Sequence, residues 1–352
     1  MRLLVTIQHP AHVHFFRNAI AELRGAGHEV FVFARRNEVT VDLLDTYGID
    51  HQVLAEESDS LAELAKVQAT YELRLLRHAR RLDPDVMTAI GGVAVSHVAA
   101  LVGARSVVFY DTEHATIIRR LAYPFADEVC TPDCYTGNVG AEHVSYPGYH
   151  ELAYLHPDRY TPDDSVLADE GLEETDTLAV CRFSSWDSSH DMGQGGFDDP
   201  ADVVEHLLDA GATVRLTSEA DLPPELEQYH LSVAPERMHD LLYYADLYVG
   251  EGATTAAEAA VLGTPAVYVN TLTMGYTTEL DERYGLLFQY DGTNRHVDGI
   301  VRARELALDG DDGQWRRRRE RLLAEKRDTT EVVLDRLLAA GAETESEAGA
   351  SA

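Results

Sequence analysis

Apolar residues alternate between short continuous runs and longer stretches with helical spacing, from the first residues onward. Residues 3–7 form an apolar run that predicts a buried strand, and residues 15–23 repeat apolar positions at helical spacing, which predicts a helix. Gly25 and Gly27 end that helix. The same alternation predicts strands at 29–34, 51–54, 86–90, 106–110, 129–131 and 143–145, with helices at 41–47, 60–82 and 93–102. It is typical of a mostly parallel sheet that helices cover on both faces.

The pattern pauses near the middle of the chain and then starts again. Prolines, glycines and aspartates concentrate between residues 148 and 165, as is typical of a linker. Beyond it, strands are predicted at 178–181, 213–216, 247–249 and 266–269, with helices at 201–210, 238–244, 254–262, 297–309 and 314–340. The sequence therefore predicts two Rossmann-like α/β domains, residues 1–155 and 156–340. The last residues, 341–352, lack core-forming side chains and are predicted to be disordered.

The amino-acid composition indicates the charge of the surface more than it indicates the fold. Acidic residues number 61 against 29 basic ones, the formal net charge is -32, and Lys66 and Lys326 are the only lysines. An acidic, lysine-poor surface is typical of halophilic proteins, which work at high intracellular salt where screening relieves self-repulsion. Such a surface argues against the binding of nucleic acid or of an anionic membrane.

Cysteine usage and the ends of the chain bear on its compartment. Cys130, Cys134 and Cys181 cannot form a disulfide framework, and no second pair of ligands lies near the first two to hold zinc. The chain begins directly on a predicted strand, and no apolar run reaches the roughly 18 residues of a membrane span. We therefore expect a soluble, cytoplasmic protein without a signal peptide.

The sharpest local signal lies in residues 245–269, where a predicted strand ends in glycines and a helix begins at once. Gly252 and Ala253 let a ligand approach the backbone, and the N–H groups of the first helical turn attract a diphosphate. Thr254 and Thr255 add hydroxyl donors. Glu258 lies about one turn into the helix, where its carboxylate can accept the hydroxyls of a ribose. The alternative is an ordinary strand–helix turn with Glu258 solvated.

The complete string closely resembles the donor-binding segment of GT-B glycosyltransferases, particularly those of the MurG type. The matching positions are Gly252-Ala253-x-Thr255-x-x-Glu258 and then Leu262-Gly263-x-Pro265-Ala266. The resemblance implies a GT-B fold, two Rossmann-like parallel-sheet domains that face a cleft. It also implies that Glu258 binds the ribose and that the backbone of residues 252–255 binds the diphosphate. Over residues 1–335 the chain resembles the GT-B-like family catalogued as domain of unknown function 354.

The start of the first domain carries the resemblance further. The predicted strand 3–7 is followed by Gln8-His9-Pro10-Ala11-His12, where many GT-B enzymes have a histidine in their first loop. The resemblance places His12 as the base that accepts a proton from an attacking hydroxyl, which suits an imidazole. The family's glycine-rich first loop is absent here. His14 is a candidate for substrate binding or for packing, and His9 is compatible with a structural or a functional role.

Polar residues and glycines also follow two predicted strands of the first domain, at the usual ligand crevice of a parallel sheet. They are Gly91, Gly92, Asp111, Glu113 and His114. We expect Asp111 and Glu113 to be catalytic and the other three to bind substrate. Alternatively, Asp111 or Thr112 caps a helix and Glu113 is solvated. The segment also resembles the carboxylate-bearing loop of the non-hydrolysing UDP-N-acetylglucosamine 2-epimerases, which share the GT-B fold.

The second domain holds further donor-side candidates near the ends of its predicted strands. They are Arg182, Ser184, Glu219, Met274 and Gly275. Arg182 can clamp a diphosphate with its planar guanidinium, or it is an ordinary surface arginine. Glu219 is expected near the nucleotide base, and Met274 and Gly275 lie near where related enzymes contact the sugar.

These residues favour a metal-independent glycosyltransferase that moves a sugar from a nucleotide-sugar donor to an envelope glycan or lipid acceptor, in polysaccharide biosynthesis. No cofactor or metal is expected, and a lipid acceptor is compatible with peripheral membrane contact. The basic run at 316–319 is more typical of a helix face. One alternative is a sugar 2-epimerase, in which Asp111 and Glu113 are essential and no acceptor is needed. Another is a nucleotide-sugar-binding protein without catalysis.

Overall fold

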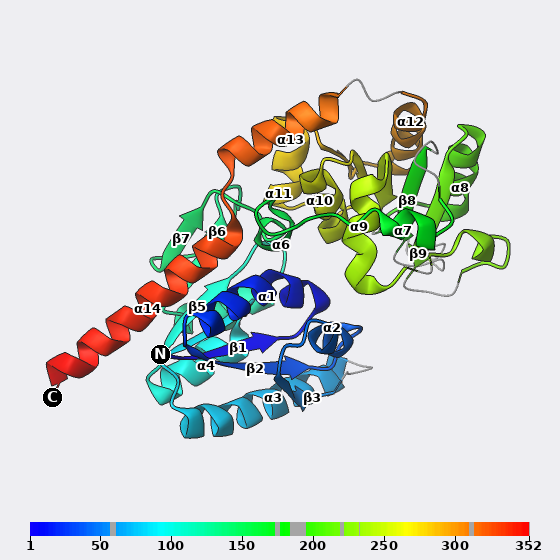
Figure 1. Cartoon of the computed structure of the whole chain (residues 1–352). Coiled ribbons are helices and arrows are strands. Elements are labelled where there is room, and N and C mark those ends of the chain that lie inside the picture. The colour runs from blue at the N-terminus through cyan, green and yellow to red at the C-terminus, as the bar shows by residue number, and fades with distance from the viewer. Residues whose placement is uncertain are drawn as a thin grey trace. The chain divides into compact units, whose positions relative to one another are not determined.

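The computed structural model describes residues 1–56, 61–172, 177–183, 195–218, 222–231, 233–309 and 313–351 (Figure 1). Its contacts divide the chain into two compact units. The first unit contains Met1–Tyr154 and Arg327–Ala352, and the second contains Leu155–Lys326. The chain therefore leaves the first unit once, builds the second, and returns to the first for its last helix.

The first unit is built on a parallel sheet, which has seven strands among the described residues. Their order is β3-β2-β1-β4-β5-β6-β7. The strands are β1 (Arg2–Ile7), β2 (Glu29–Arg35), β3 (His51–Ala55), β4 (Val86–Ile90), β5 (Arg105–Phe109), β6 (Glu128–Pro132) and β7 (His143–Tyr146). Leu4 in β1 pairs with Phe31 of β2 on one side and with Met87 of β4 on the other. The first strand of the chain is thus central in its sheet.

Helices cover both faces of this sheet (Figure 1). They are α1 (Pro10–Gly25), α2 (Thr40–Thr46), α3 (Leu61–Leu82), α4 (Val93–Val102), α5 (Thr116–Ala122) and α14 (Thr329–Ser351), with the short helix α6 (Leu152–Leu155) leading into the second unit. Leu4 packs with Tyr71 of α3 and Val95 of α4 in one core cluster. Its neighbours Leu3 and Val5 are equally buried, on the opposite face by alternation, where α1 and α14 contact each other. Burial on both faces explains the continuous apolar run of β1.

The second unit repeats the architecture with a smaller parallel sheet. In the described residues its order is β12-β11-β10-β8-β9. The strands are β8 (Leu178–Phe183), β9 (Thr213–Ser218), β10 (Leu247–Gly250), β11 (Ala266–Val269) and β12 (Leu287–Tyr290). The helices are α7 (Ser165–Asp169), α8 (Pro200–Asp209), α9 (Met238–Tyr244), α10 (Ala253–Leu262), α11 (Gly275–Glu279), α12 (Arg295–Leu308) and α13 (Gln314–Glu325). Helices α8 and α12 share a core cluster with one face of the sheet.

The predicted elements correspond closely to the observed ones. The predictions for 86–90, 93–102, 238–244 and 266–269 match β4, α4, α9 and β11 at both ends. Strand β12 and the short helices α5, α6, α7 and α11 were not predicted. Among the described residues, no helix is both long enough and apolar enough to cross a membrane.

The end of the chain differs from the expectation of one helix and a disordered tail. The predicted helix 314–340 is divided into α13 and α14, and α14 continues to Ser351. Helix α14 packs on the first unit, where the Thr330 hydroxyl donates a hydrogen bond to the Ala153 carbonyl oxygen at 2.7 Å. The Arg336 guanidinium donates two hydrogen bonds to the Glu128 carboxylate, at 2.6 and 2.8 Å. These long-range contacts hold the first half of α14, and nearer its end the Thr344 hydroxyl donates a hydrogen bond to the Asp85 carbonyl oxygen at 3.4 Å.

Gly92 is required by the packing at the start of α4, so replacing it should be costly. Its φ is 65°, and an added Cβ would overlap the side chain of Val108 in β5. We expect Gly92→Ala to lower the free energy of unfolding by about 3 kcal/mol, because the backbone is left-handed and the core is already filled. Denaturant unfolding in molar salt measures this loss.

Gly103 at the other end of α4 provides the matched control. Its φ is 80°, but an added Cβ would have no atom within 4 Å. Gly103→Ala should therefore cost only the backbone strain, about 1 kcal/mol. Equal losses in the two variants would show that contact with Val108 does not matter.

Candidate functional site

In parallel α/β sheets ligands bind at the carboxyl ends of the strands, where the direction of the connections reverses. The reversal lies between β1 and β4 in the first unit and between β8 and β10 in the second. His12 follows β1, and Gly252 follows β10. Each unit therefore carries sequence-predicted residues at its own reversal point.

His9 begins helix α1 and so determines where His12 lies. Its backbone is extended, and its Nδ1 accepts a hydrogen bond from the Ala11 N–H at 3.2 Å. Pro10 takes the first helical position, where its missing N–H costs nothing. His12 thus lies in the first turn of α1 rather than in a loop before it, with its Nδ1 3.5 Å from the Gln8 amide nitrogen.

The His12 imidazole is held in its neutral, proton-accepting form. Burial, together with the neighbouring His9 and His150 rings, lowers the pKa of His12 to about 3, although Asp111 opposes the shift. The position of His12 at the amino end of α1 also lowers its pKa, because the helix dipole disfavours a cation there. His12 is therefore uncharged over the whole neutral pH range, and a base of so low a pKa depends on the Asp111 carboxylate to stabilise the imidazolium when it takes a proton.

Asp111 follows β5 and is paired with a histidine that the sequence analysis missed. The Asp111 Oδ2 lies 3.0 Å from Nδ1 of the buried His150, and its Oδ1 accepts a hydrogen bond from the Thr112 hydroxyl at 2.9 Å. Burial raises the pKa of Asp111, but His150 and Thr112 outweigh it and keep that pKa below its usual value. Helix α5 begins only at Thr116, so neither Asp111 nor Thr112 caps it.

His150 lies in the segment after β7 that the sequence analysis treated as the start of a linker. Its ring packs against Phe15 of α1, with centroids 4.6 Å apart. Its Nε2 is buried and has no hydrogen-bond partner within the described parts of the chain. His150 could have been predicted as a site residue from its position after a predicted strand, which is how Asp111 was identified.

The other predicted residues of the first unit have different surroundings. Glu113 accepts a hydrogen bond from the Thr136 N–H at 3.1 Å, so it is not simply solvated, and His114 is exposed. Gly91 and Gly92 are buried in the turn between β4 and α4. His14 is buried between the rings of Tyr47 and Tyr154.

In the second unit, atoms of β10 and of the neighbouring strand β8 pack tightly against the turn after β10. A Cβ on Gly250 would overlap the Tyr248 hydroxyl and would lie 2.6 Å from the Arg182 carbonyl oxygen of the neighbouring strand β8. Gly252 is the N-cap of α10, and in the described structure no side chain caps that helix. The first N–H groups of α10, at Ala253 to Thr255, have no partner within the helix. They form a site that favours an anion.

Glu258 lies one turn into α10 and is buried, with 7% of its surface exposed, so it is not solvated. Its Oε1 lies 3.0 Å from Nε2 of His239 in α9, which is buried as well. His239 was not singled out from the sequence, because nothing local connects a residue of α9 to one of α10. The pair orients the carboxylate beside the amino end of α10.

Glu251, which was not among the predicted site residues, connects the turn after β10 to its surroundings. Its carboxylate accepts a hydrogen bond from the Phe197 N–H at 2.7 Å, and its backbone oxygen accepts one from the Asn270 side chain at 3.0 Å. Arg295 donates to the backbone oxygens of Gly195 and Gly196. The turn after β10 is therefore held in place by its own unit.

Three of the remaining donor-side candidates belong to the described residues. Arg182 is half-buried near the end of β8, Met274 is buried, and Gly275 begins α11. Ser184 and Glu219 lie outside the described residues.

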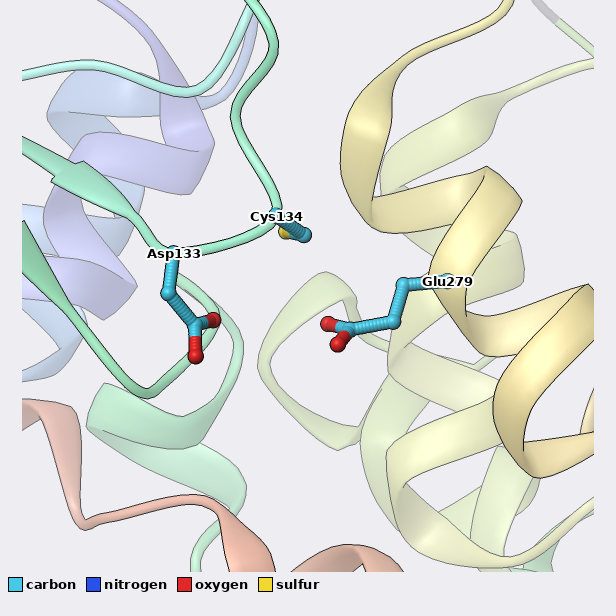
Figure 2. A group of neighbouring side chains, drawn as sticks. All are labelled: Asp133, Cys134 and Glu279. Carbon is cyan, nitrogen blue, oxygen red and sulfur yellow. The ribbon is translucent and has the colours of Figure 1, made fainter.

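Three side chains, those of Asp133, Cys134 and Glu279, are potential metal ligands. Figure 2 shows Asp133 and Cys134 in the turn after β6, and Glu279 at the end of α11. The first two belong to the first unit and Glu279 to the second. Among the described residues, neither unit taken alone groups three side chains that could ligate a metal ion. We therefore assign no metal site to these residues.

The fold recurs in solved structures of nucleotide-sugar proteins. The UDP-GlcNAc 2-epimerase from Neisseria meningitidis bound to UDP-GlcNAc matches with a TM-score of 0.67 at 10% identity, over 96% of this chain and 100% of that one. Glycosyltransferase VinC in complex with dTDP matches with a TM-score of 0.65 at 18% identity, over 97% of this chain and 100% of that one. At these identities the likeness shows the fold alone, α/β of the GT-B type with two Rossmann-like units.

Sequence comparison identifies the family. The uncharacterized protein MJ0665 of Methanocaldococcus jannaschii is 24% identical over 280 residues, which are 75% of this chain and 80% of that protein. The family model described as "Protein of unknown function (DUF354)" matches residues 1–338. The chain therefore belongs to the DUF354 family, as its resemblance had predicted.

Proposed function

We propose that the protein is a glycosyltransferase that moves a sugar from a nucleotide-sugar donor to an envelope glycan or lipid acceptor, without a metal ion. The observation that carries the proposal is the turn after β10. There Gly250 and Gly252 lead directly into α10, which no described side chain caps, and the buried Glu258 lies one turn further. This arrangement suits a diphosphate joined to a ribose. The structures of VinC with dTDP and of the Neisseria epimerase with UDP-GlcNAc support nucleotide-sugar chemistry on this fold.

In the proposed reaction each unit supplies its own groups. The second unit binds the donor: residues 252–255 hold the diphosphate, Glu258 accepts a ribose hydroxyl, and Arg182 adds positive charge. Ser184, Glu219, Met274 and Gly275 are proposed around the base and the sugar. The bond between the anomeric carbon and the diphosphate oxygen breaks, and the negative charge that develops is stabilised by the amino end of α10.

The first unit supplies the acid–base groups. His12 takes the proton from the acceptor hydroxyl as that oxygen bonds to the anomeric carbon, and Asp111 stabilises the imidazolium. His150 holds the Asp111 carboxylate and is a positioning residue. Glu113, His114 and the Gly91–Gly92 turn are proposed on the acceptor side. The packing of His14 favours a structural role, so we leave it out of the proposed site.

The second candidate is a sugar 2-epimerase, and the pair of Asp111 with His150 favours it. A half-buried carboxylate next to two imidazoles can transfer protons without any acceptor, which is what an epimerase requires.

The test is incubation of the protein in molar salt with UDP-, GDP- and dTDP-sugars and no acceptor, followed by NMR and mass spectrometry. Binding of a donor with only slow hydrolysis to the nucleoside diphosphate supports a transferase. A new epimer of the sugar supports the second candidate instead. Binding without any turnover, even with glycan and lipid phosphate acceptors added, would indicate a binding protein, and no binding at all would overturn both enzyme proposals.

A further inference from the structure

A cavity of about 540 Å³ lies in the first unit, beside α5 and the 3₁₀ turn η1 (Tyr123–Phe125). The proposed catalytic residues His12 and Asp111 do not line it. The lining residues that matter here are Arg119, Arg120, Tyr123, Pro124, Asn138 and Glu142. The cavity therefore combines two cations with an aromatic ring and an amide, in a chain whose net charge is -32.

The two arginines that line the cavity keep their positive charge without a carboxylate partner in the described part of the chain. Among the described residues, neither Arg119 nor Arg120 makes an ion pair or a hydrogen bond to a carboxylate, although the chain has 61 acidic residues. The Arg119 Nε is buried and has no hydrogen-bond partner in the described structure. Glu142 lines the cavity and limits how much negative charge it accepts. A guanidinium that remains unpaired in so acidic a chain is suited to an anion from outside it.

An exposed apolar face adjoins these arginines. Ile117 and Leu121 lie one helical turn apart on α5 and are 72% and 46% exposed, and Phe125 in η1 is 52% exposed. Phe125 packs edge-on against His97 of α4, and Leu101, one turn further along α4, is 64% exposed. We call Leu101, Ile117, Leu121 and Phe125 the α4–α5 apolar face. Contiguous exposed apolar groups beside cations are typical of a surface that meets a lipid.

We propose that this cavity and the α4–α5 apolar face bind a membrane lipid that carries a phosphate group. Arg119 and Arg120 take the phosphate, and the apolar face enters the hydrocarbon boundary beside it. The inference rests on the proposed function and narrows its acceptor class to lipid phosphates. At molar salt the Debye length is only about 3 Å, so the rest of the acidic surface neither attracts nor repels the bilayer at a distance. Direct contacts at the cavity then decide binding.

The experiment is flotation of the full-length protein with vesicles in molar salt. Phosphatidylcholine vesicles that contain phosphatidic acid are compared with vesicles of phosphatidylcholine alone. We expect the protein to float with the first and not with the second. Arg119→Gln/Arg120→Gln should bind the phosphatidic acid vesicles at least about tenfold more weakly, because the direct charge-assisted hydrogen bonds to the phosphate are lost.

Two further variants distinguish specific binding at this site from nonspecific adsorption to vesicles. Ile117→Ser/Leu121→Ser replaces exposed side chains and should weaken flotation without changing thermal unfolding. Arg316→Gln/Arg317→Gln removes two neighbouring cations from α13 in the second unit and should float like the unchanged protein. If the arginine and serine variants float normally, or if the α13 variant loses binding equally, the inference is wrong.

Two other results would assign the site to a different occupant and overturn the lipid inference. Glycerol phosphate that abolishes flotation at low concentration would indicate a soluble phosphate ligand instead of a lipid. Loss of a dimer in the serine variant, measured by sedimentation without vesicles, would assign the face to a second copy of the chain. Binding of UDP- or GDP-sugars is measured separately on the same samples. Donor binding without flotation overturns only the lipid inference, and flotation without donor binding overturns only the proposed function.

Discussion

We expect His12→Asn to lower kcat for sugar transfer by about 10²- to 10⁴-fold, the usual contribution of a general base. Donor affinity should change little, because His12 belongs to the first unit and the proposed donor groups belong to the second. The asparagine keeps a polar side chain in the first turn of α1 but cannot take the proton. Initial rates with saturating donor and acceptor measure kcat, and isothermal titration with the donor alone measures affinity.

The pH profile of the unchanged protein provides a second readout of the same residue. Because the pKa of His12 is lowered to about 3, the imidazole stays neutral from about pH 5 upward and the base remains available. Activity that depends on His12 should therefore stay flat between about pH 5 and pH 8. It should fall only as the pH approaches the lowered pKa from above, because protonation there removes the base.

His28 provides a histidine control in the same unit. It precedes β2, at the opposite end of the sheet from the carboxyl end of β1, and contacts the amino terminus. His28→Gln should leave kcat within about twofold of the unchanged protein, as for a surface position. An undiminished kcat in His12→Asn, or a rate that halves near pH 6.5, would contradict the assignment of His12 as the base.

The second large effect is expected at the buried pair of Glu258 and His239. Glu258→Ala should weaken UDP binding by about 10- to 100-fold, as when a charged hydrogen bond to a ligand is lost. The unchanged protein should bind UDP more tightly than 2′,3′-dideoxy-UDP, and the variant should bind the two equally. If GDP is the preferred nucleotide, the same comparison is made with GDP and its dideoxy form. Isothermal titration in molar salt measures each affinity.

His239→Ala tests the positioning of the carboxylate. Removing the neighbour of a buried acid should lower the free energy of unfolding by about 3 kcal/mol. The double variant Glu258→Ala/His239→Ala should lose less than the sum of the single losses, because the two side chains interact directly. Glu205→Gln on the exposed surface of α8 is the control and should change neither stability nor affinity. If Glu258→Ala still prefers UDP over its dideoxy form, the proposal that Glu258 binds the ribose is wrong.

Much of the fold could be predicted because its signals are local. Buried parallel strands appear as apolar runs, and glycines or prolines mark their ends, so β4 and β11 were predicted at both ends. Strand β12 was missed because it forms the edge of its sheet and is only partly buried, which leaves a weak apolar pattern. The division between α13 and α14 was missed because helical spacing continues across the break at residues 326–328.

The candidate site was predictable where it depends on one short segment. Gly252 and Glu258 share a strand–turn–helix unit, so the candidate anion site and the nearby carboxylate could be proposed without the rest of the molecule. The partners of these groups come from distant positions, as with His150, which lies 39 residues after Asp111 in the sequence. No local pattern encodes such a pairing, because it depends on how β5 and the segment after β7 pack.

The sequence by itself determined the α/β class, the two Rossmann-like halves, the family and the β10–α10 motif, because each of these follows from residues that are close along the chain. The tertiary structure alone decided that α14 returns to the first unit, that His150 and His239 contact the carboxylates of Asp111 and Glu258, and that Arg119 and Arg120 line a cavity without a carboxylate partner among the described residues. These features depend on burial and long-range contact, which periodicity does not record.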